Sequence, residues 1–278
     1  MIQLFHNISQ KCSRDTTETY STSFASAIKL LHRDIRQPIY NIYGFVRLAD
    51  EIVDTFHDFD KKKLLADFKI ETYDAISRKI SLNPILHSFQ ITVNEYNIDK
   101  SLIENFFDSM QMDLERTKYD EANYKKYIYG SAEVVGLMCL CIFCEGDKSK
   151  YEYLKSFAQS LGAAFQKVNF LRDMKADHNE LKRIYFPEMD FSNFTESIKL
   201  KIVRDVENDF HESYKGILLL PRKARFGVYV AYKYYLSLFK KIKSSHSSVI
   251  VNQRIRIADY KKAMILIRAG IKNQLKLI

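Results

Sequence analysis

The chain has 278 residues, of which 46% are hydrophobic, including 18 Tyr and 19 Phe, and this composition excludes an intrinsically disordered protein. Glycine and proline number only eight and four, which favours long helices over tight turns. The formal charge of +9 indicates attraction to anions such as nucleic acid, anionic lipid or a phosphorylated substrate. Because the lysines are spread along the chain rather than gathered in one stripe, we do not expect nucleic-acid binding.

Apolar residues recur at helical spacing through most of the chain, and no stretch alternates with the period of two that is typical of strands. We therefore predict a single all-α domain over residues 17–278, preceded by a polar lead-in over residues 1–16. The predicted helices cover residues 17–31, 38–56, 61–77, 85–96, 101–114, 124–144, 151–175, 194–218, 221–242 and 257–275. The connectors between them include 32–37, 182–187 and 243–252, and the second of these, with a proline and two aromatics, suits a loop folded over the end of a site.

The segment QKVNFLRDMKAD, which begins at Gln166, carries polar residues on a single helix face. Gln166, Asn169, Asp173 and Asp177 follow one another at steps of three, four and four. Two carboxylates one turn apart repel each other unless a cation lies between them, and oxygen ligands suit Mg²⁺. Arg172 beside them is a natural partner for a phosphate oxygen. The alternative interpretation is a solvated helix face with ordinary charges.

A second segment, YGFVRLADEIVD, repeats this design more than a hundred residues earlier. Asp50 and Asp54 lie one turn apart, and Arg47 precedes Asp50 by one turn. If the two helices face each other, their four carboxylates and two arginines form a pocket in which metal ions can bridge to a diphosphate. Together the two motifs favour a metal-dependent site over surface charge.

Three further groups of residues have two interpretations each. The hydroxyls of Tyr20, Ser21 and Ser23 could bind phosphate, or they could satisfy the amides at a helix N-terminus. The small residues from Gly130 to Gly136 could form the wall of an apolar channel or allow tight helix packing. Asp113 and Arg116 are expected to be surface charges.

The sequence predicts a cytoplasmic protein. Its four cysteines do not form a disulfide framework, and the N-terminus lacks the charged and apolar regions of a signal peptide. No apolar run approaches the roughly 18 residues that span a bilayer, so the apolar segment 134–144 is expected to be a core helix.

With both acidic motifs in place, the sequence resembles the phytoene/squalene synthase family, the head-to-head prenyl diphosphate synthases, and most closely their bacterial phytoene synthases. The resemblance runs from about residue 20 to residue 254, and it rests on the segments YSTSF, YGFVRLADEIVD, YIYGSAEVVGLM, FQKVNFLRDMKAD and RIYFP. It implies an all-α bundle of the isoprenoid (prenyl) synthase type with a central apolar cavity. It also implies Mg²⁺ as cofactor, with Mn²⁺ as a substitute.

The resemblance implies roles for individual residues. The metal-binding set is Asp50, Asp54, Asn169, Asp173 and Asp177. The catalytic set contains the four aspartates with Arg47, Arg172 and Tyr129. The substrate-binding set is Tyr20, Ser21, Ser23, Phe24, Arg47, Tyr127, Gln166, Asn169, Arg172 and Tyr235.

Three positions depart from the family pattern. Tyr20 stands where histidine is frequent, Glu51 where a second aspartate is frequent, and Glu133 where glycine is frequent. A carboxylate at Glu133, near an apolar cavity, would be costly unless it is paired or turned outward.

The expected reaction is the condensation of two geranylgeranyl diphosphates through a cyclopropyl (prephytoene) diphosphate to 15-cis-phytoene, without NADPH, in carotenoid biosynthesis. The alternatives are dehydrosqualene or squalene synthesis from two farnesyl diphosphates, a class I terpene cyclase or chain-elongating prenyl synthase, and a non-catalytic basic scaffold that binds membranes or a protein. We also expect peripheral membrane contact for product release, whereas the oligomeric state stays open.

Overall fold

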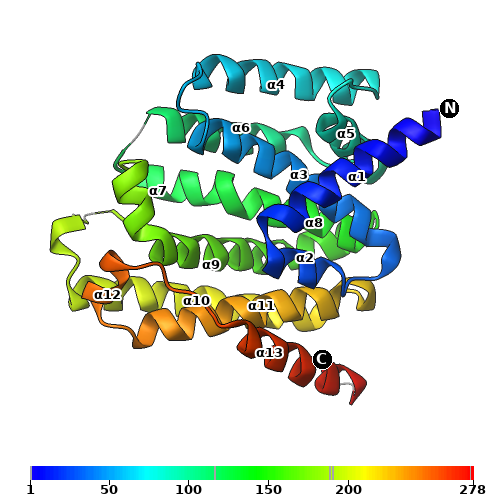
Figure 1. Cartoon of the computed structure of the whole chain (residues 1–278). Coiled ribbons are helices and arrows are strands. Elements are labelled where there is room, and N and C mark those ends of the chain that lie inside the picture. The colour runs from blue at the N-terminus through cyan, green and yellow to red at the C-terminus, as the bar shows by residue number, and fades with distance from the viewer. Residues whose placement is uncertain (1, 116, 188, 190, 276) are drawn as a thin grey trace.

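A computed structural model describes residues 2–115, 117–187, 189, 191–275 and 277–278, and in this part of the chain there is no β-strand. Figure 1 shows the helices stacked in rows from α4 at the top down to α10 and α11, with α13 below them. The elements are α1 (Ile2–Tyr20), α2 (Thr22–Ile28), α3 (Arg33–Asp54), α4 (Lys61–Arg78), α5 (Pro84–Tyr96), α6 (Lys100–Glu115), α7 (Glu121–Ile128), the π-helix η1 (Tyr129–Glu133), α8 (Val134–Cys144), α9 (Lys148–Glu180), the 3₁₀ helix η2 (Phe191–Asn193), α10 (Glu196–Leu219), α11 (Arg222–Ser244), α12 (Ser247–Asn252) and α13 (Asp259–Gln274). The predicted all-α class is confirmed.

Polar side chains cap several of these helices. Asn83 accepts hydrogen bonds from the first backbone amides of α5, and Pro84 follows it in the first turn. Asp60 caps α4 and Asp147 caps α9 in the same way. The sequence therefore determines these starts locally.

The expected polar lead-in is wrong, because residues 2–20 form helix α1. Its inward face carries small hydroxyl side chains, and Ser13 lies against Ser88 of α5, with their Oγ atoms 2.5 Å apart. A Cβ added to Gly44 of α3 would come within 2.8 Å of the Ser13 Oγ. Small residues thus bring α1 close to its neighbours without the apolar pattern that would have predicted a packed helix.

Several further boundaries differ from the prediction, and three of the differences concern the ends or interruptions of helices that have a local cause. The expected helix 17–31 is interrupted at Ser21, which has extended backbone and caps α2. Helix α3 begins at Arg33 rather than at Pro38. Pro38 lies inside the helix near its N-terminal end, where a proline is tolerated better than in the middle. The expected loop 243–252 contains α12, and His246 caps it.

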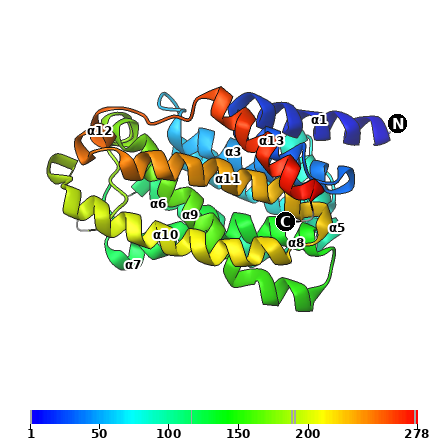
Figure 2. The same ribbon diagram turned by 90° about the horizontal axis from the view of Figure 1, so that it is seen from below.

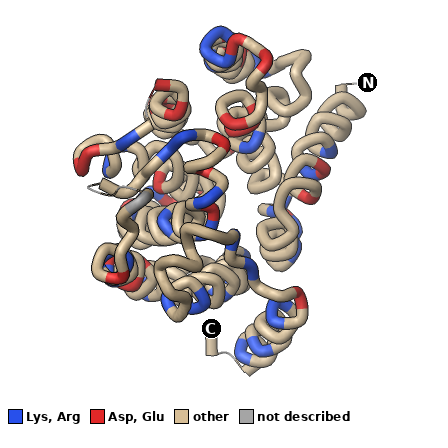
Figure 3. Tube along the Cα trace, turned by 60° about the vertical axis from the view of Figure 1, so that its left-hand side comes forward, with Lys and Arg blue, Asp and Glu red and all other residues tan. Residues whose placement is uncertain are grey.

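Two clusters of buried side chains form the core. In the first, Phe45 of α3 stacks on Phe89 of α5 with ring centroids 3.9 Å apart, and helices α4, α6 and α8 contribute most of the other buried side chains. The second cluster gathers around α9, α10 and α11 and includes Val168, Val206 and Val230. Figures 2 and 3 show α1 and α13 on one side of this bundle.

Helices α7, η1 and α8 run together as one helix of 24 residues, and an apolar window of 18 residues within it has a mean hydropathy of 1.7. By length and composition this helix could cross a membrane, which corrects the expectation that no apolar run reaches such a length. More than half of its apolar window is buried inside the bundle, and Val134, Leu137 and Met138 are fully buried. Residues 134–144 are therefore a core helix, as predicted.

Gly162 of α9 lies close to the backbone of η1. A Cβ at Gly162 would lie 2.7 Å from the carbonyl oxygen of Ala132, whereas a Cβ at Gly270 of α13 meets no atom within 4 Å. We expect Gly162→Ala to lower the free energy of unfolding by about 1–3 kcal/mol and Gly270→Ala not to lower it. Urea denaturation measures both, and equal stability of the two variants would contradict the close packing.

Candidate active site

A cavity of about 590 Å³ lies between the two core clusters, and helices α2, α3, α8, α9, α10 and α11 line it. Along α9 the lining residues extend from Leu154 to Asp177. At about 1.5 Å per residue this distance is roughly 34 Å. The cavity is therefore long, with acidic side chains at one end and apolar side chains at the other.

The structure brings the two acidic motifs together. Asp50 and Asp54 of α3 and Asp173 and Asp177 of α9 all line the same cavity. Burial raises the pKa of Asp50 to about 8, and the neighbouring Asp54 adds to this shift. Burial also raises the pKa of Asp177 to about 8, with a further contribution from Asp173. The carboxylates are thus crowded enough that a bound cation would relieve their repulsion.

Asp113 of α6 is a fifth carboxylate at this end, and its assignment as a surface charge is wrong. Its side chain is only 3% exposed. The hydroxyl of Tyr127 donates to its Oδ2 at 2.8 Å, and burial raises its pKa to about 7. The sequence held a signal for this, because Asp113 follows the apolar Phe106 and Met110 at steps of four and three. Arg116, also expected at the surface, lies outside the described residues.

The connector 182–187 folds over the acidic end, as predicted, and Arg183 anchors it. Its Nη1 donates to Asp54 Oδ1 at 2.6 Å and lies 3.4 Å from Asp113 Oδ1. Its Nη2 donates to the backbone carbonyl of Asp113 at 3.1 Å. The sequence did not indicate this role of Arg183, since its partners are remote in the chain.

Two further arginines contact the second acidic motif. Arg172 donates from Nε to both carboxylate oxygens of Asp173, at 3.1 and 3.0 Å. Arg254, which follows α12, donates to Asp173 Oδ1 at 2.7 Å and is half exposed. These two guanidinium groups place positive charge beside the carboxylates at the cavity mouth.

Arg47 occupies the corresponding place on α3. Its guanidinium lies 4.3 Å above the ring of Tyr20 and is paired with Glu51. Within the described part of the chain its buried Nε has no hydrogen-bond partner. A buried donor without a partner costs free energy, and an anionic oxygen in the cavity would satisfy it.

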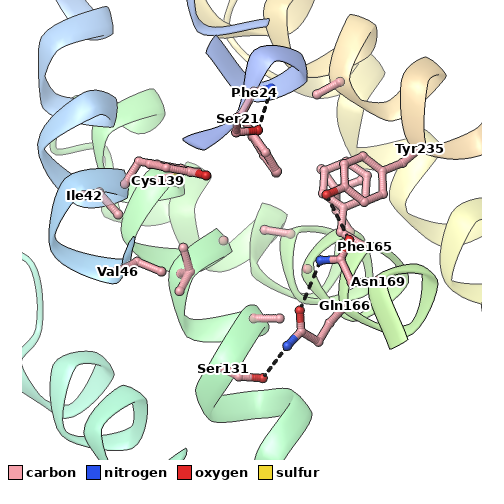
Figure 4. A pocket seen from close by; sticks show the side chains of 18 of the residues that line it. Ser21, Phe24, Ile42, Val46, Ser131, Cys139, Phe165, Gln166, Asn169 and Tyr235 are labelled. Atoms are coloured by element: carbon pink, nitrogen blue, oxygen red, sulfur yellow. Dashed lines mark hydrogen bonds between the residues drawn. The ribbon is translucent and has the colours of Figure 1, made fainter. Parts of the chain in front are cut away.

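A chain of hydrogen bonds crosses the middle of the cavity (Figure 4). Tyr235 donates to Asn169 Oδ1 at 3.2 Å, Asn169 donates to Gln166 Oε1 at 3.4 Å, and Gln166 donates to Ser131 Oγ at 3.3 Å. These four residues line the cavity together. The spacing of Gln166 and Asn169 predicted their common face, and the structure adds Ser131 of the π-helix. Single-turn π-helices are frequent at functional sites.

Aromatic rings form one wall of the same region. Phe165 stacks on Tyr235 with centroids 3.9 Å apart, and Phe24 lies 5.8 Å from Tyr235. In Figure 4, Ile42 and Cys139 lie across the cavity from this wall. The middle of the cavity is therefore apolar apart from the hydrogen-bonded chain.

The remaining predicted residues divide into two groups. Tyr20 and Ser21 line the cavity, although Ser21 also caps α2 by accepting a hydrogen bond from the Phe24 amide. Ser23 and Tyr129 are not among the residues that line it. Tyr129 instead packs against the first core cluster.

Glu133 has a clear structural explanation. Gln159 donates a hydrogen bond of 2.9 Å to its Oε2, and Glu133 is not among the lining residues. Burial raises its pKa. The carboxylate is therefore paired next to the cavity rather than exposed to it.

No three His, Cys, Asp or Glu side chains among the described residues converge into a ready metal site. The aspartates surround the acidic end instead. The atoms of the aspartates that could bind a metal ion are all oxygens, and oxygen ligands fit Mg²⁺. This ion keeps waters and substrate phosphates in its coordination shell. The residues thus fit a cation that a phosphorylated ligand helps to hold.

The chain was compared with known proteins. The model of the squalene/phytoene synthase family matches residues 17–261. A phytoene synthase from Arthrospira platensis is 27% identical over 95% of this chain and 93% of its own length. A 4,4'-diapophytoene synthase from Staphylococcus haemolyticus is 28% identical over 68% of this chain and 66% of its own length. The crystal structure of a dehydrosqualene synthase has a TM-score of 0.81 at 20% identity and covers 98% of both chains, which shows a common fold.

The raised pKa values predict how stability depends on pH when divalent cations are absent. Asp50 and Asp177 have a pKa of about 8 in the folded chain and about 4 when unfolded. The folded state therefore keeps protons that the unfolded state releases, so this contribution is complete below about pH 4 and is lost as the pH rises through about 8. We expect Asp177→Asn to raise the thermal unfolding midpoint at about pH 9 and to flatten its pH dependence.

Thermal unfolding in the presence of a chelator, at about pH 6 and about pH 9, measures this effect. Asp58→Asn serves as a control, because Asp58 is exposed in the loop before α4. A midpoint for Asp177→Asn that follows the wild type at both pH values would contradict the crowding of the carboxylates.

Proposed function

The chain belongs to the squalene/phytoene synthase family and is a prenyltransferase of the head-to-head prenyl diphosphate synthase type, and on this premise we propose that it is a Mg²⁺-dependent 15-cis-phytoene synthase. In this proposal it condenses two geranylgeranyl diphosphates through prephytoene diphosphate and releases two diphosphates. The meeting of two aspartate-bearing helices at one end of a long apolar cavity carries the proposal. The similarity to a phytoene synthase over nearly the whole of both chains supports this substrate.

The acidic end would bind the diphosphate groups. Asp50, Asp54, Asp173 and Asp177, with Asn169 beside them, would hold Mg²⁺, and Mn²⁺ would substitute for it. The bound ion would supply Lewis-acid stabilisation of the negative charge on the departing diphosphate. The unpaired Nε of Arg47 supports the presence of an anion at this end. Arg172 and Arg254 would neutralise further phosphate charge.

The apolar part would protect the carbocation formed when diphosphate leaves. Apolar side chains line this part, and the faces of Phe165 and Tyr235 can stabilise a cation. The double bond of the second substrate attacks this allylic cation and loses a proton to give the cyclopropyl diphosphate. A second ionisation, rearrangement and loss of another proton then yield the linear hydrocarbon, with no reductant required. Of the predicted catalytic residues, Tyr129 is not among those that line the cavity, and its catalytic role stays a prediction.

Dehydrosqualene or squalene synthesis from two farnesyl diphosphates is the second candidate. The similarity to a 4,4'-diapophytoene synthase and the structural likeness to a dehydrosqualene synthase favour it. A non-catalytic scaffold would leave the paired acidic motifs unexplained. For either product, an apolar hydrocarbon, we propose a cytoplasmic enzyme in peripheral contact with a membrane.

Product analysis tests the proposed reaction. Purified protein is incubated with Mg²⁺ and either geranylgeranyl or farnesyl diphosphate, each with and without NADPH. We expect phytoene from the longer substrate without NADPH, and Asp173→Asn should lower turnover by at least about a hundredfold while leaving the helix content unchanged. A thirty-carbon product would support the second candidate instead. Wild-type turnover by Asp173→Asn would contradict the role of the acidic end.

Phe157 of α9 helps to close the apolar end of the cavity. Lining residues at this end also include Phe143, Leu154 and Leu220. A Cβ added to Gly216 of α10 would come within 2.2 Å of the Phe157 Cβ, so Phe157 fills space that only a glycine leaves free. Phe157 therefore limits the length of the prenyl chain that fits between it and the acidic end.

We expect Phe157→Ala to shift preference toward the longer prenyl diphosphate. The ratio of kcat/KM for geranylgeranyl over farnesyl diphosphate should rise by about tenfold, because the removed ring makes room for apolar carbons worth about 0.8 kcal/mol each. Tyr153→Ala, which removes an exposed aromatic side chain one turn away, is the control. An unchanged ratio in Phe157→Ala, with a stably folded variant, would show that other residues limit chain length.

A further inference from the structure

Helix α13 carries a stripe of apolar side chains on its outer surface. Tyr260, Met264, Ile267 and Ile271 follow one another at steps of four, three and four, which places them on one helix face. They are 64%, 43%, 63% and 52% exposed. Leu275, at the end of the helix, continues the stripe and is 63% exposed. We call these five residues the outer stripe.

The outer stripe has no part in holding α13 to the bundle. That contact is made by a different face, on which Ala269 is buried and Ile265 and Leu266 pack against the second core cluster. A surface helix needs one such apolar face, whereas α13 has two. The second face is therefore available to something outside the chain.

Positive charge borders the outer stripe. Lys261, Arg268 and Lys272 are exposed and lie along one flank of it. Asp259, in the first turn, is the one acidic residue of the helix. An exposed apolar face with a basic border is the pattern of helices that lie in the interface of an anionic membrane.

The position of α13 also suits a membrane contact. It packs against α11, whose other side lines the cavity through Val228, Ala231 and Tyr235. One helix thus separates α13 from the cavity, and Figure 2 shows α13 beside α11 from below. The family match ends at residue 261, near the start of α13, so the outer stripe apart from Tyr260 lies beyond the part of the chain that the family model describes.

We propose that α13 docks this protein on an anionic phospholipid bilayer, with the outer stripe in the acyl boundary and its basic border among the headgroups. The biological role of this docking rests on the proposed function, because an apolar product would leave through the membrane contact. The docking itself does not depend on that function for its test, since vesicle binding requires no prenyl diphosphate.

A second copy of the chain is a less suitable occupant. Stable protein interfaces bury on the order of 1,000 Å² or more, and the outer stripe is one row of side chains on one helix. Two copies in contact here would also bring their basic borders together, which is repulsive. Anionic headgroups would instead be attracted to the same lysines and arginine.

Vesicle flotation tests the proposal with the full chain. Vesicles of phosphatidylcholine alone are compared with vesicles of equal parts phosphatidylcholine and phosphatidylglycerol, in the absence of substrate. We expect binding to the mixed vesicles, and Ile267→Glu/Ile271→Glu should weaken it by at least about tenfold. The matched control is Ile70→Glu/Leu82→Glu, which makes the same charge change at residues that are 62% and 93% exposed elsewhere.

A second variant separates the electrostatic part. Lys261→Gln/Arg268→Gln/Lys272→Gln should weaken binding to the mixed vesicles by at least about tenfold, because each removed charge weakens the attraction to anionic headgroups. This variant leaves the outer stripe intact, and circular dichroism verifies that each variant is folded. Turnover of a detergent-dispersed substrate should be the same in all variants. If the wild type itself shows no turnover, this result counts against the proposed function and not against docking.

Three outcomes would overturn the docking proposal. The wild type could fail to bind the mixed vesicles, or the control could lose binding as strongly as Ile267→Glu/Ile271→Glu. Sedimentation could also show a wild-type dimer that the stripe variant dissociates, and the outer stripe would then be an interface between two copies.

Discussion

The acidic end of the cavity imposes the constraint on which the rest of the structure depends, because ionised carboxylates removed from water repel one another. Burial raises the pKa of Asp50 and Asp177 to about 8. Arg183 offsets part of this cost by contacting Asp54 and Asp113 at once. The loop that carries Arg183 is therefore held over the cavity by the charge that it neutralises, and the remaining charge is available to a cation and its phosphorylated ligand.

Long helices connect this acidic end with the apolar end. Helix α9, with 33 residues, carries Asp177 near its C-terminus and Phe157 on the wall at the far end. Gly162 allows α9 to contact η1 closely, and Gly216 of α10 leaves space for Phe157 of α9. Larger residues at either position would prevent these contacts. Because helices resist bending, the place where a diphosphate binds and the length of chain that fits below it are set by the same elements. Positioning and substrate length are thus linked through rigid walls.

The stacking of helices in layers also determines the outer surface. Helix α11 lines the cavity with one side and supports α13 with the other. Helix α13 then buries Ala269 inward and leaves Ile267 and Ile271 outward. The proposed reaction, which turns charged diphosphates into an apolar hydrocarbon, needs both a polar entrance and an apolar destination. The arrangement puts an apolar, basic-bordered surface one helix away from the cavity.

The sequence by itself determined the helical class, several helix caps and the two acidic faces, because each depends on residues within one or two turns of one another. Only the tertiary structure decided which faces meet. Asp113 and Arg183, 70 residues apart, acquire their roles from each other. Helix α1 reads as a polar lead-in until its serines are packed against neighbouring helices, and Glu133 is explained only by Gln159 on another helix. Periodicity records which side of a helix is buried, whereas the partner that covers it comes from segments remote in the chain.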